Sequence, residues 1–327
     1  MEWKSLLLLP VILTASAAFG EGDPTIRIGM LASGTVNWEV TAARNEGFDQ
    51  ASGIAIEGIR LASPDAAKIA LQGDAVDLIV TDWIWVAQQR AAGQADFTFI
   101  PYSAHQGVVL VRADAPIDSL VGLKGKRIGV AGGGLDKNWL LLRGVMMEKY
   151  GFDPETAAEP VFGAPPLLTE QLRLGRLDAL LAYWHFAVKL EAEGYRRLVD
   201  GNALLESLGA DPQMASLGFV FRERWARQRG EVLQSFLRAM NSARDALCSV
   251  DEIWGKVAFL TGEARPEIQQ ALRKGYCAGR STVTGPVQQA SAEKVWALLR
   301  RVDKEDHSSR LAGLPKGVFW ETDMPKR

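Results

Sequence analysis

A repeating alternation of short apolar runs and longer amphipathic stretches constrains the fold more than any other feature of this sequence. This alternation is typical of parallel sheets covered by helices, so we expect an α/β fold. From Glu223 onward the sequence is mainly helical in character, and the strand predicted just before it, Leu217–Arg222, is expected to return to the first group of strands. That first group is Ile26–Leu31, Ala55–Leu61, Asp77–Thr81, Phe97–Tyr102 and Gly107–Arg112, and the second group is Arg127–Ala131, Glu159–Phe162, Ala179–Tyr183 and Arg196–Val199.

The chain has 327 residues, which suggests two domains at the usual size of about 100–200 residues each. The turn-rich stretch 116–126 separates a predicted strand from the next one, so a second lobe is expected to begin near Ala113. Asp211-Pro212 marks the expected return to the first lobe. We therefore predict a signal peptide at 1–20, a discontinuous lobe I at 21–112 plus 213–327, and lobe II at 113–212.

The N-terminus has the order of residues found in signal peptides. Lys4 precedes the apolar run 6–13, and small residues follow it up to Gly20. The apolar run is far shorter than the roughly 20 residues of a membrane-spanning helix. Cleavage after Ala17 or after Gly20 would each fit, and no cysteine lies near either position. We expect free export into a periplasm rather than a lipid-anchored form.

Composition limits the partners and cofactors. The formal net charge is -2, and acidic and basic residues are interspersed, so nucleic acid is not an expected partner. Cys248 and Cys277 are the only cysteines; a disulfide and two buried free thiols remain alternatives. His105 and His307 have no metal-ligand spacing with each other or with the cysteines, so neither a metal nor a cofactor is expected.

One unit of sequence occurs twice. Residues 69–80 and 170–181 each read as a helix, a glycine that ends it, and an aspartate that opens a buried strand. Such units also occur by chance in α/β proteins. The repeat nevertheless suggests that each lobe carries the same helix–strand element.

These residues resemble a known family, the periplasmic binding proteins of the nitrate, sulfonate, taurine and thiamine-precursor importers. The resemblance rests on the signal peptide, the first strand running into 33–38, the helix end at 72–77, and 118–120 followed by 123–130. It covers nearly all of the mature chain. The resemblance implies a type II periplasmic-binding-protein fold, two α/β lobes with a ligand cleft between them. It also implies a monomeric binding protein that serves the permease and ATPase complex of an ABC importer.

Ligands of open α/β sheets lie beyond the carboxyl ends of the strands, where helix N-termini converge. Gly132-Gly133-Gly134 could bring backbone N–H groups close to an anion, or could serve only a turn that needs a positive φ. The paired prolines 165–166 would form a rigid wall of the cleft. The predicted ligand-binding residues are Ser33, Gly34, Thr35, Asn37, Trp38, Asp82, Trp83, Tyr102, Ser103, Gly133, Gly134, Asp136, Lys137, Trp139, Trp184 and His185.

The chain has ten tryptophans, and several follow predicted strands, where they could stack on a planar ring or attract a cationic amine. Trp85 is instead expected in the core. Asp82 and Asp136 are helix N-caps or ligand contacts, and His185 is a ligand contact or a structural group. A carboxylate in the cleft would favour an amine-bearing ligand, a nitrogen heterocycle or a zwitterion over a simple anion.

We therefore expect the substrate-binding protein of an ABC importer and not an enzyme. The solute would be of the sulfonate, taurine or nitrate type, or a nitrogen heterocycle of the thiamine-precursor type. One alternative is a periplasmic sensor or accessory protein that acts on a partner other than a transporter. A pyrimidine-synthase-like enzyme is a further alternative, although the sequence has no nucleophile elbow and no metal-ligand set.

Overall fold

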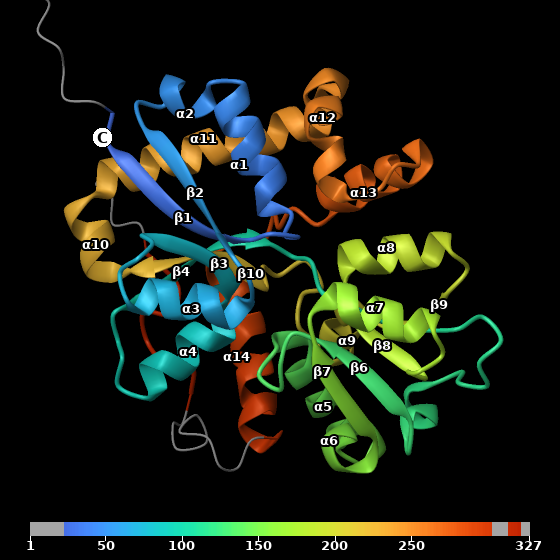
Figure 1. Cartoon of the computed structure of the whole chain (residues 1–327). Coiled ribbons are helices and arrows are strands. Elements are labelled where there is room, and N and C mark those ends of the chain that lie inside the picture. The colour runs from blue at the N-terminus through green and yellow to red at the C-terminus, as the bar shows by residue number, and fades with distance from the viewer. Residues whose placement is uncertain (1–22, 303–312, 322–327) are drawn as a thin grey trace, which may run out of the picture.

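A computed structural model describes residues 23–302 and 313–321 of the chain (Figure 1). The predicted signal peptide and His307 lie outside these described residues. The described part contains two five-stranded sheets, each covered by helices. We call the first sheet with its helices lobe I and the second sheet with its helices lobe II.

Lobe I is built on a mixed sheet of order β2-β1-β3-β10-β4. β1 is parallel to β2 and β3, whereas β10 is antiparallel to β3 and β4. The late strand Leu217–Arg222 therefore returns to the first sheet, as predicted. The strands are β1 (Thr25–Leu31), β2 (Ala55–Leu61), β3 (Leu78–Asp82), β4 (Phe97–Ser103) and β10 (Leu217–Arg222), and the helices between them are α1 (Val36–Asn45), α2 (Phe48–Ala51), α3 (Pro64–Gln72) and α4 (Trp83–Ala91).

Lobe II is built on a sheet of order β7-β6-β8-β5-β9. β6 is parallel to β7 and β8, and β5 is antiparallel to β8 and β9. The strands are β5 (Gly107–Val111), β6 (Arg127–Ala131), β7 (Glu159–Gly163), β8 (Ala179–Tyr183) and β9 (Arg196–Asp200); the helices are η1 (Leu120–Leu123), α5 (Lys137–Tyr150), α6 (Pro154–Ala157), α7 (Pro165–Arg173), α8 (Trp184–Ala192) and α9 (Gly201–Ser207).

The predicted boundary between the lobes is wrong at one strand. β5 was expected in lobe I, but it pairs with β8 and β9 in the second sheet. The chain therefore crosses between the sheets at 104–106 and not near Ala113. An apolar strand shows no preference for either sheet from its own sequence, and the long turn 112–126 that follows it only leads on to β6 within lobe II.

The C-terminal third is helical and completes lobe I. Cys248 of α11 and Cys277 of α13 are joined by a disulfide, which decides between the two alternatives for this pair. The last described segment returns to β4, where Phe319 pairs with Phe99. These elements are α10 (Glu223–Gln228), α11 (Gly230–Ser249), α12 (Asp251–Val257), η2 (Ala258–Thr261), α13 (Pro266–Ala278) and α14 (Gly285–Val302).

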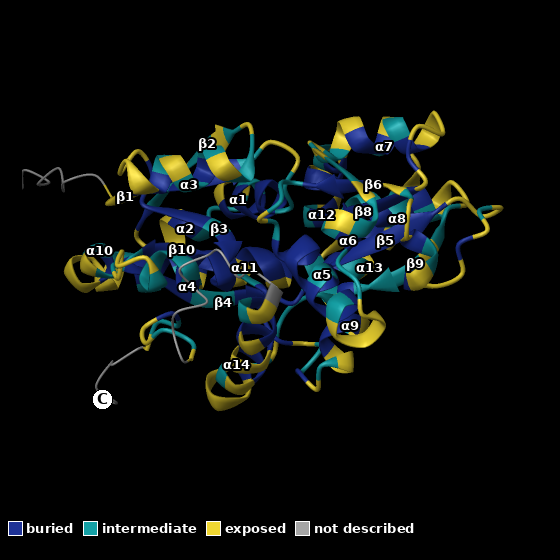
Figure 2. Cartoon of the chain, turned by 90° about the horizontal axis from the view of Figure 1, so that it is seen from below, coloured by how far each residue is buried: buried dark blue, intermediate teal, exposed yellow. Residues whose placement is uncertain are grey.

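One apolar core joins the two lobes. α14 packs against α5 of lobe II, and the largest cluster of buried side chains includes Trp83 of lobe I, Leu141 of lobe II and Trp296 of α14. Figure 2 shows that α11 of lobe I and α5 of lobe II are both largely buried. Among residues 23–302 and 313–321 no helix is long and apolar enough to cross a membrane.

Candidate functional site: the cleft between the lobes

Helix α1 brings the first predicted loop to the cleft. Its N-terminus has no side-chain cap bond among the described residues, and the acidic residue of its first turn, Glu39, is buried and hydrogen-bonded to Tyr102 and Tyr276. The Asn37 amide group donates to the carbonyl oxygens of Leu31 at 2.6 Å and Ala32 at 2.9 Å. Asn37 is thereby committed to holding the loop, and Ser33, Gly34 and Thr35 are left as the partly exposed tip.

Helix α8 begins on the other side of the cleft. Its N-cap residue, Tyr183, makes no side-chain cap bond within the described ranges. His185 follows in the first turn and faces the backbone of Ser33. Both ring nitrogens of His185 are buried without a hydrogen-bond partner in the described part of the protein. Burial lowers the pKa of His185 to about 3, so the neutral ring has one donor and one acceptor to offer a ligand.

Two aspartates cap the other helices of the cleft. Asp82 accepts a hydrogen bond from the backbone N–H of Trp85 at 2.8 Å, and Asp136 accepts one from Asn138 at 2.8 Å. Each cap bond uses a single carboxylate oxygen. The second oxygen of Asp136 accepts from the Tyr183 hydroxyl at 3.2 Å, and burial raises the pKa of Asp136. Both residues are therefore N-caps, and the second oxygen of Asp82 likewise accepts from a hydroxyl, that of Thr81 at 3.3 Å.

Lys137 is buried and is not a free cation of the cleft. Its ammonium group donates to the carbonyl oxygen of His105 at 3.2 Å, to Gln106 Oε1 at 2.8 Å and to Asn138 Oδ1 at 2.9 Å. These bonds use all three donors of a lysine, and burial lowers its pKa to about 8. Lys137 therefore fastens the crossing segment to α5, and its ligand contact stays a prediction.

The glycine loop before α5 contains both a glycine that the turn requires and glycines whose backbone is open to a ligand. Gly132 has φ 98° and lies so close to Asp136 and Tyr183 that a Cβ would come within 3.0 Å of both side chains. Gly133 has an ordinary φ, and a Cβ there would meet no atom within 4 Å. Gly132 therefore serves the turn, whereas Gly133 and Gly134 are partly exposed and leave the backbone open to a ligand.

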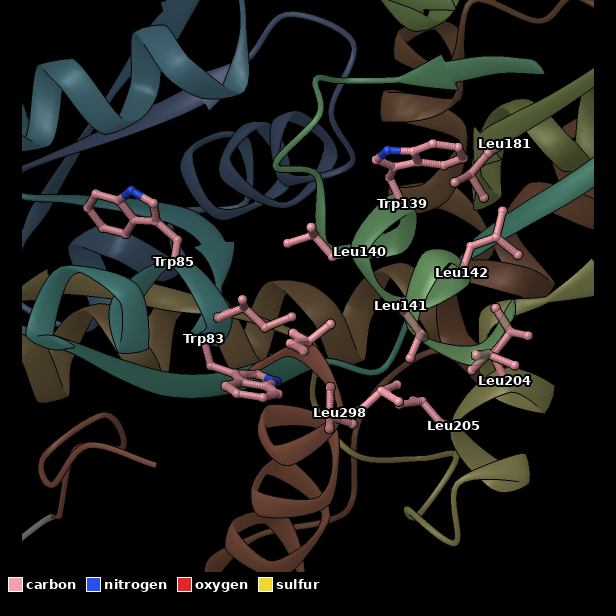
Figure 3. Packing of buried hydrophobic residues seen from close by; sticks show 14 of the residues in the cluster. Trp83, Trp85, Trp139, Leu140, Leu141, Leu142, Leu181, Leu204, Leu205 and Leu298 are labelled. Carbon is pink, nitrogen blue, oxygen red and sulfur yellow. The ribbon is translucent and has the colours of Figure 1, made fainter. Parts of the chain in front are cut away.

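Six tryptophans of the described residues are buried in the core, and Trp83, Trp85 and Trp139 are three of them. Trp139 is 0% exposed and donates its indole N–H to Glu155 at 2.8 Å, so the predicted cleft contact is wrong. Trp83 is 1% exposed and packs near Leu298 of α14 (Figure 3), and it lines a small cavity together with Gln106 and Lys137, so its ligand contact stays a prediction. Trp85 packs on Phe97 in the core, as predicted. A tryptophan that follows a strand can thus point into the core or toward the cleft, and its position in the sequence does not distinguish the two.

Trp38 and Trp184 lie where the lobes meet. Their ring centroids are 6.3 Å apart in an edge-to-face arrangement. Trp38 also contacts Trp254 and Tyr276, both of lobe I. The two indoles therefore bring the N-termini of α1 and α8 together across the cleft.

Tyr102 and Ser103 are buried and hydrogen-bonded to protein groups, and their ligand contacts stay predictions. The Tyr102 hydroxyl donates to the buried carboxylate of Glu39, which also accepts from Tyr276 at 2.6 Å. Ser103 Oγ is hydrogen-bonded to His105 Nδ1 at 2.8 Å. Glu39 is not among the predicted site residues, because a single carboxylate within an amphipathic helix gives no sign that it is buried.

Tyr183 and Gln106 were also missed as members of the cleft. Tyr183 contacts Asp136, and Gln106 contacts Lys137 and the Ser216 hydroxyl. The signal for Tyr183 was its position as the last residue of a predicted strand. Gln106 had no comparable signal, because the crossing segment was placed elsewhere.

A groove of about 670 Å³ lies outside the cleft, along α1, α2 and the β1–β2 side of lobe I. Its lining includes Arg44, Asp49 and Arg60 and comes from lobe I alone. Binding there would not bridge the lobes. The cleft is the better candidate site because residues of both lobes converge on it.

Two sheets joined by crossing segments, with helix N-termini meeting between them, define the type II periplasmic-binding-protein fold. The alkanesulfonate-binding protein of Xanthomonas axonopodis pv. citri, solved with bound MOPS, superposes with a TM-score of 0.69 at 19% identity, over 90% of this chain and 98% of that one. The periplasmic aliphatic sulphonate-binding protein of Escherichia coli gives 0.67 at 20% identity, over 91% and 92%. A Candida albicans protein with the generic periplasmic-binding-protein fold gives 0.61 at 13% identity, over 93% and 100%.

A protein-family model described as NMT1/THI5 like matches residues 36–249. The chain belongs to this family. Family and fold together confirm the predicted resemblance to the nitrate, sulfonate and taurine group of solute-binding proteins. No curated protein sequence matches the chain.

Proposed function

We propose that this protein is the extracytoplasmic substrate-binding protein of an ABC-type importer, which captures a small organic solute between its lobes and delivers it to a membrane permease. The observation that carries the proposal is His185. Its two ring nitrogens are buried without a well-formed hydrogen bond in the described part of the chain, and the ring lies beside the backbone of Ser33 at the tip of the opposite lobe. Buried polar atoms are seldom left unpaired unless a ligand or water completes them.

The chemistry of the cleft suits a solute with two different ends. The positive ends of α1 and α8 favour an acceptor group such as a sulfonate or carboxylate. The second oxygens of Asp82 and Asp136 favour a hydrogen-bond donor, such as an ammonium group or the amino group of a heterocycle. We therefore favour a zwitterion of the taurine type or an amino-substituted nitrogen heterocycle over nitrate or a simple alkanesulfonate.

Transport needs no covalent step. A solute bound to the loop 33–35 of lobe I would recruit His185 of lobe II, and the bridging contacts would favour the closed state that the permease recognises. Residues 1–20 supply export in this proposal, and the Cys248–Cys277 disulfide is of the kind that persists in an oxidising compartment. We expect the protein to act as a monomer, with the permease and ATPase complex as its partner.

The test is a thermal-shift screen of the mature protein against taurine, alkanesulfonates, aminopyrimidines, amines and nitrate, followed by calorimetry on each hit. A ligand that binds only the folded state raises the melting temperature according to its affinity. His185→Ala should weaken binding of the hit at least tenfold, the loss expected from about 1.4 kcal/mol of hydrogen bonding. Tyr150→Ala, an exposed aromatic at the far end of α5, is the control.

Two results would change the proposal. Full affinity in His185→Ala would remove this residue from the site while leaving the binding protein in place. If no compound of any class produced a shift, the proposed solute classes would be wrong, and the accessory role on another partner would become the better reading.

A further inference from the structure

Trp184 of lobe II is seated in a slot formed by lobe I and the crossing segment. Its ring stacks on His105, with centroids 4.1 Å apart and planes inclined by 8°. Trp38 approaches it edge-on at 6.3 Å. On α13, a Cβ at Gly275 would come within 2.8 Å of the Trp184 ring. The slot therefore exists only because position 275 lacks a side chain.

His105, the stacking partner in this slot, is held by contacts that do not involve Trp184. His105 Nδ1 is hydrogen-bonded to Ser103 Oγ at 2.8 Å, and its Nε2 lies 3.0 Å from the carbonyl oxygen of Gly275. Gly279 passes so close that a Cβ there would approach the imidazole to 2.1 Å. Both ring nitrogens and one edge of His105 are thus held by Ser103, Gly275 and Gly279, all of lobe I. The imidazole face is the part left for stacking.

A second contact ties the same helix to lobe I. Lys189, one turn further along α8, donates to the carbonyl oxygen of Thr261 in η2 at 2.5 Å. Helix α8 is therefore attached to the C-terminal helices of lobe I at two points along its length. All of these contacts are between protein groups.

We propose that Trp184 is a latch, which seats in the slot formed by His105, Trp38 and Gly275 and holds the lobes closed in the absence of cargo. The latch adds a residue of lobe II to an aromatic site of lobe I. A binding protein with such a latch has a populated closed state before it meets its solute. Its solute then need not supply all of the free energy of closure.

The test is small-angle X-ray scattering on the mature protein without any added solute. The wild type should be compact, with a radius of gyration near the value of about 19 Å expected for a globular chain of this length, and its scattering should fit the closed structure. Trp184→Ala removes the latch and should give a larger radius, with the closed population lowered at least tenfold.

Gly275→Ala disrupts the same contact by a change in lobe I. Alanine is a better helix former than glycine, so α13 itself should not suffer, and any opening comes from the clash with Trp184. Gly255→Ala is the matched control, because Gly255 also lies in a helix and a Cβ there meets no atom within 4 Å. Gly275→Ala should expand the protein, and Gly255→Ala should leave it compact.

Three results would overturn the latch. They are an expanded wild type without solute, a compact Gly275→Ala or Trp184→Ala variant, and an expansion of Gly255→Ala as large as that of Gly275→Ala. Circular dichroism on each variant separates opening of the lobes from loss of folding. The inference goes beyond the proposed function, and the scattering contains no cargo. A protein that binds its solute from an open resting state would therefore keep the function and lose the latch.

Discussion

The two lobes contain the same helix–strand unit, and the unit is closed by the same bonds. In lobe I the Asp77 carboxylate accepts from the backbone N–H of Arg27 at 2.7 Å, and the Asp77 N–H donates to the Arg27 carbonyl oxygen at 2.9 Å. In lobe II Asp178 makes the same pair of bonds with Arg127, at 2.8 Å and 2.9 Å. The sequence repeat is therefore a structural repeat, in which an aspartate ties the start of one strand to that of its neighbour.

The units differ at the opposite end of the strand, where the cleft lies. After β3, Asp82 caps α4 and Trp83 turns into the core at 1% exposure. After β8, Tyr183 leaves α8 without a side-chain cap in the described structure, and Trp184 turns toward the other lobe. One repeat uses this position for stability, and the other leaves it for contacts across the cleft. Local sequence builds the same unit twice, and only the surroundings divide the roles.

The largest test of this difference is truncation of the two equivalent tryptophans. Trp83→Ala should lower the free energy of unfolding by about 3–5 kcal/mol, the usual cost of removing a fully buried large aromatic side chain. Trp184→Ala should cost less than about half as much, because this side chain is only partly buried. Urea denaturation of both variants measures the difference. Equal losses would show that both tryptophans are core residues and would end the comparison.

The sequence predicted the sheets better than the cleft. Strand positions follow from local apolar patterns, so all ten predicted strands are present. The contacts of Lys137 and Trp139 depend on Gln106 and Glu155, which come from other segments. A single sequence does not indicate which polar side chains from distant segments will be hydrogen-bonded to each other. The strand β5 shows the same limit, because its own residues carry no information about the sheet it joins.

A second prediction concerns acid, because both described histidines lie at the boundary between the lobes. Burial lowers the pKa of His105 to about 4 and that of His185 to about 3. The unfolded chain binds a proton on each histidine near pH 6.5 and the folded chain does not. The stability they contribute is therefore complete above about pH 6.5 and is lost as the pH falls toward 4. Between pH 7 and pH 5 each histidine should lower the free energy of unfolding by roughly 1–2 kcal/mol.

Urea unfolding at pH 7, 6 and 5 checks this prediction, with His185→Asn beside the wild type. The variant should lose less stability on acidification. Burial raises the pKa values of Glu39 and Asp136, so these carboxyl groups add stability as the pH falls. Because they are present in both proteins, the difference between wild type and variant isolates the contribution of His185. The same acid dependence in both proteins would mean that His185 is not desolvated at the lobe boundary.

The smallest expected effect is the difference in stability loss between substitutions of Asp77 and Asp178, the aspartates of the two repeats. The Asp77 side chain is 7% exposed and also binds the Arg27 guanidinium at 2.8 Å. Asp178 is exposed, and the Arg127 guanidinium turns instead to Glu159 at 3.1 Å. Asp77→Asn should therefore cost about 1–3 kcal/mol, as for a buried charged hydrogen bond, whereas Asp178→Asn should cost less than about 1 kcal/mol.

The asparagine variants keep the size of the side chain and one oxygen, so the difference between them measures charge and burial rather than packing. Denaturation in 1 M salt sharpens the test, because salt screens an exposed pair more than a buried one. The loss in Asp77→Asn should persist, and the smaller loss in Asp178→Asn should fade. If the two losses were equal in low and high salt, the repeats would be equivalent in energy as well as in geometry. The division of roles would then begin only at the cleft end of each strand.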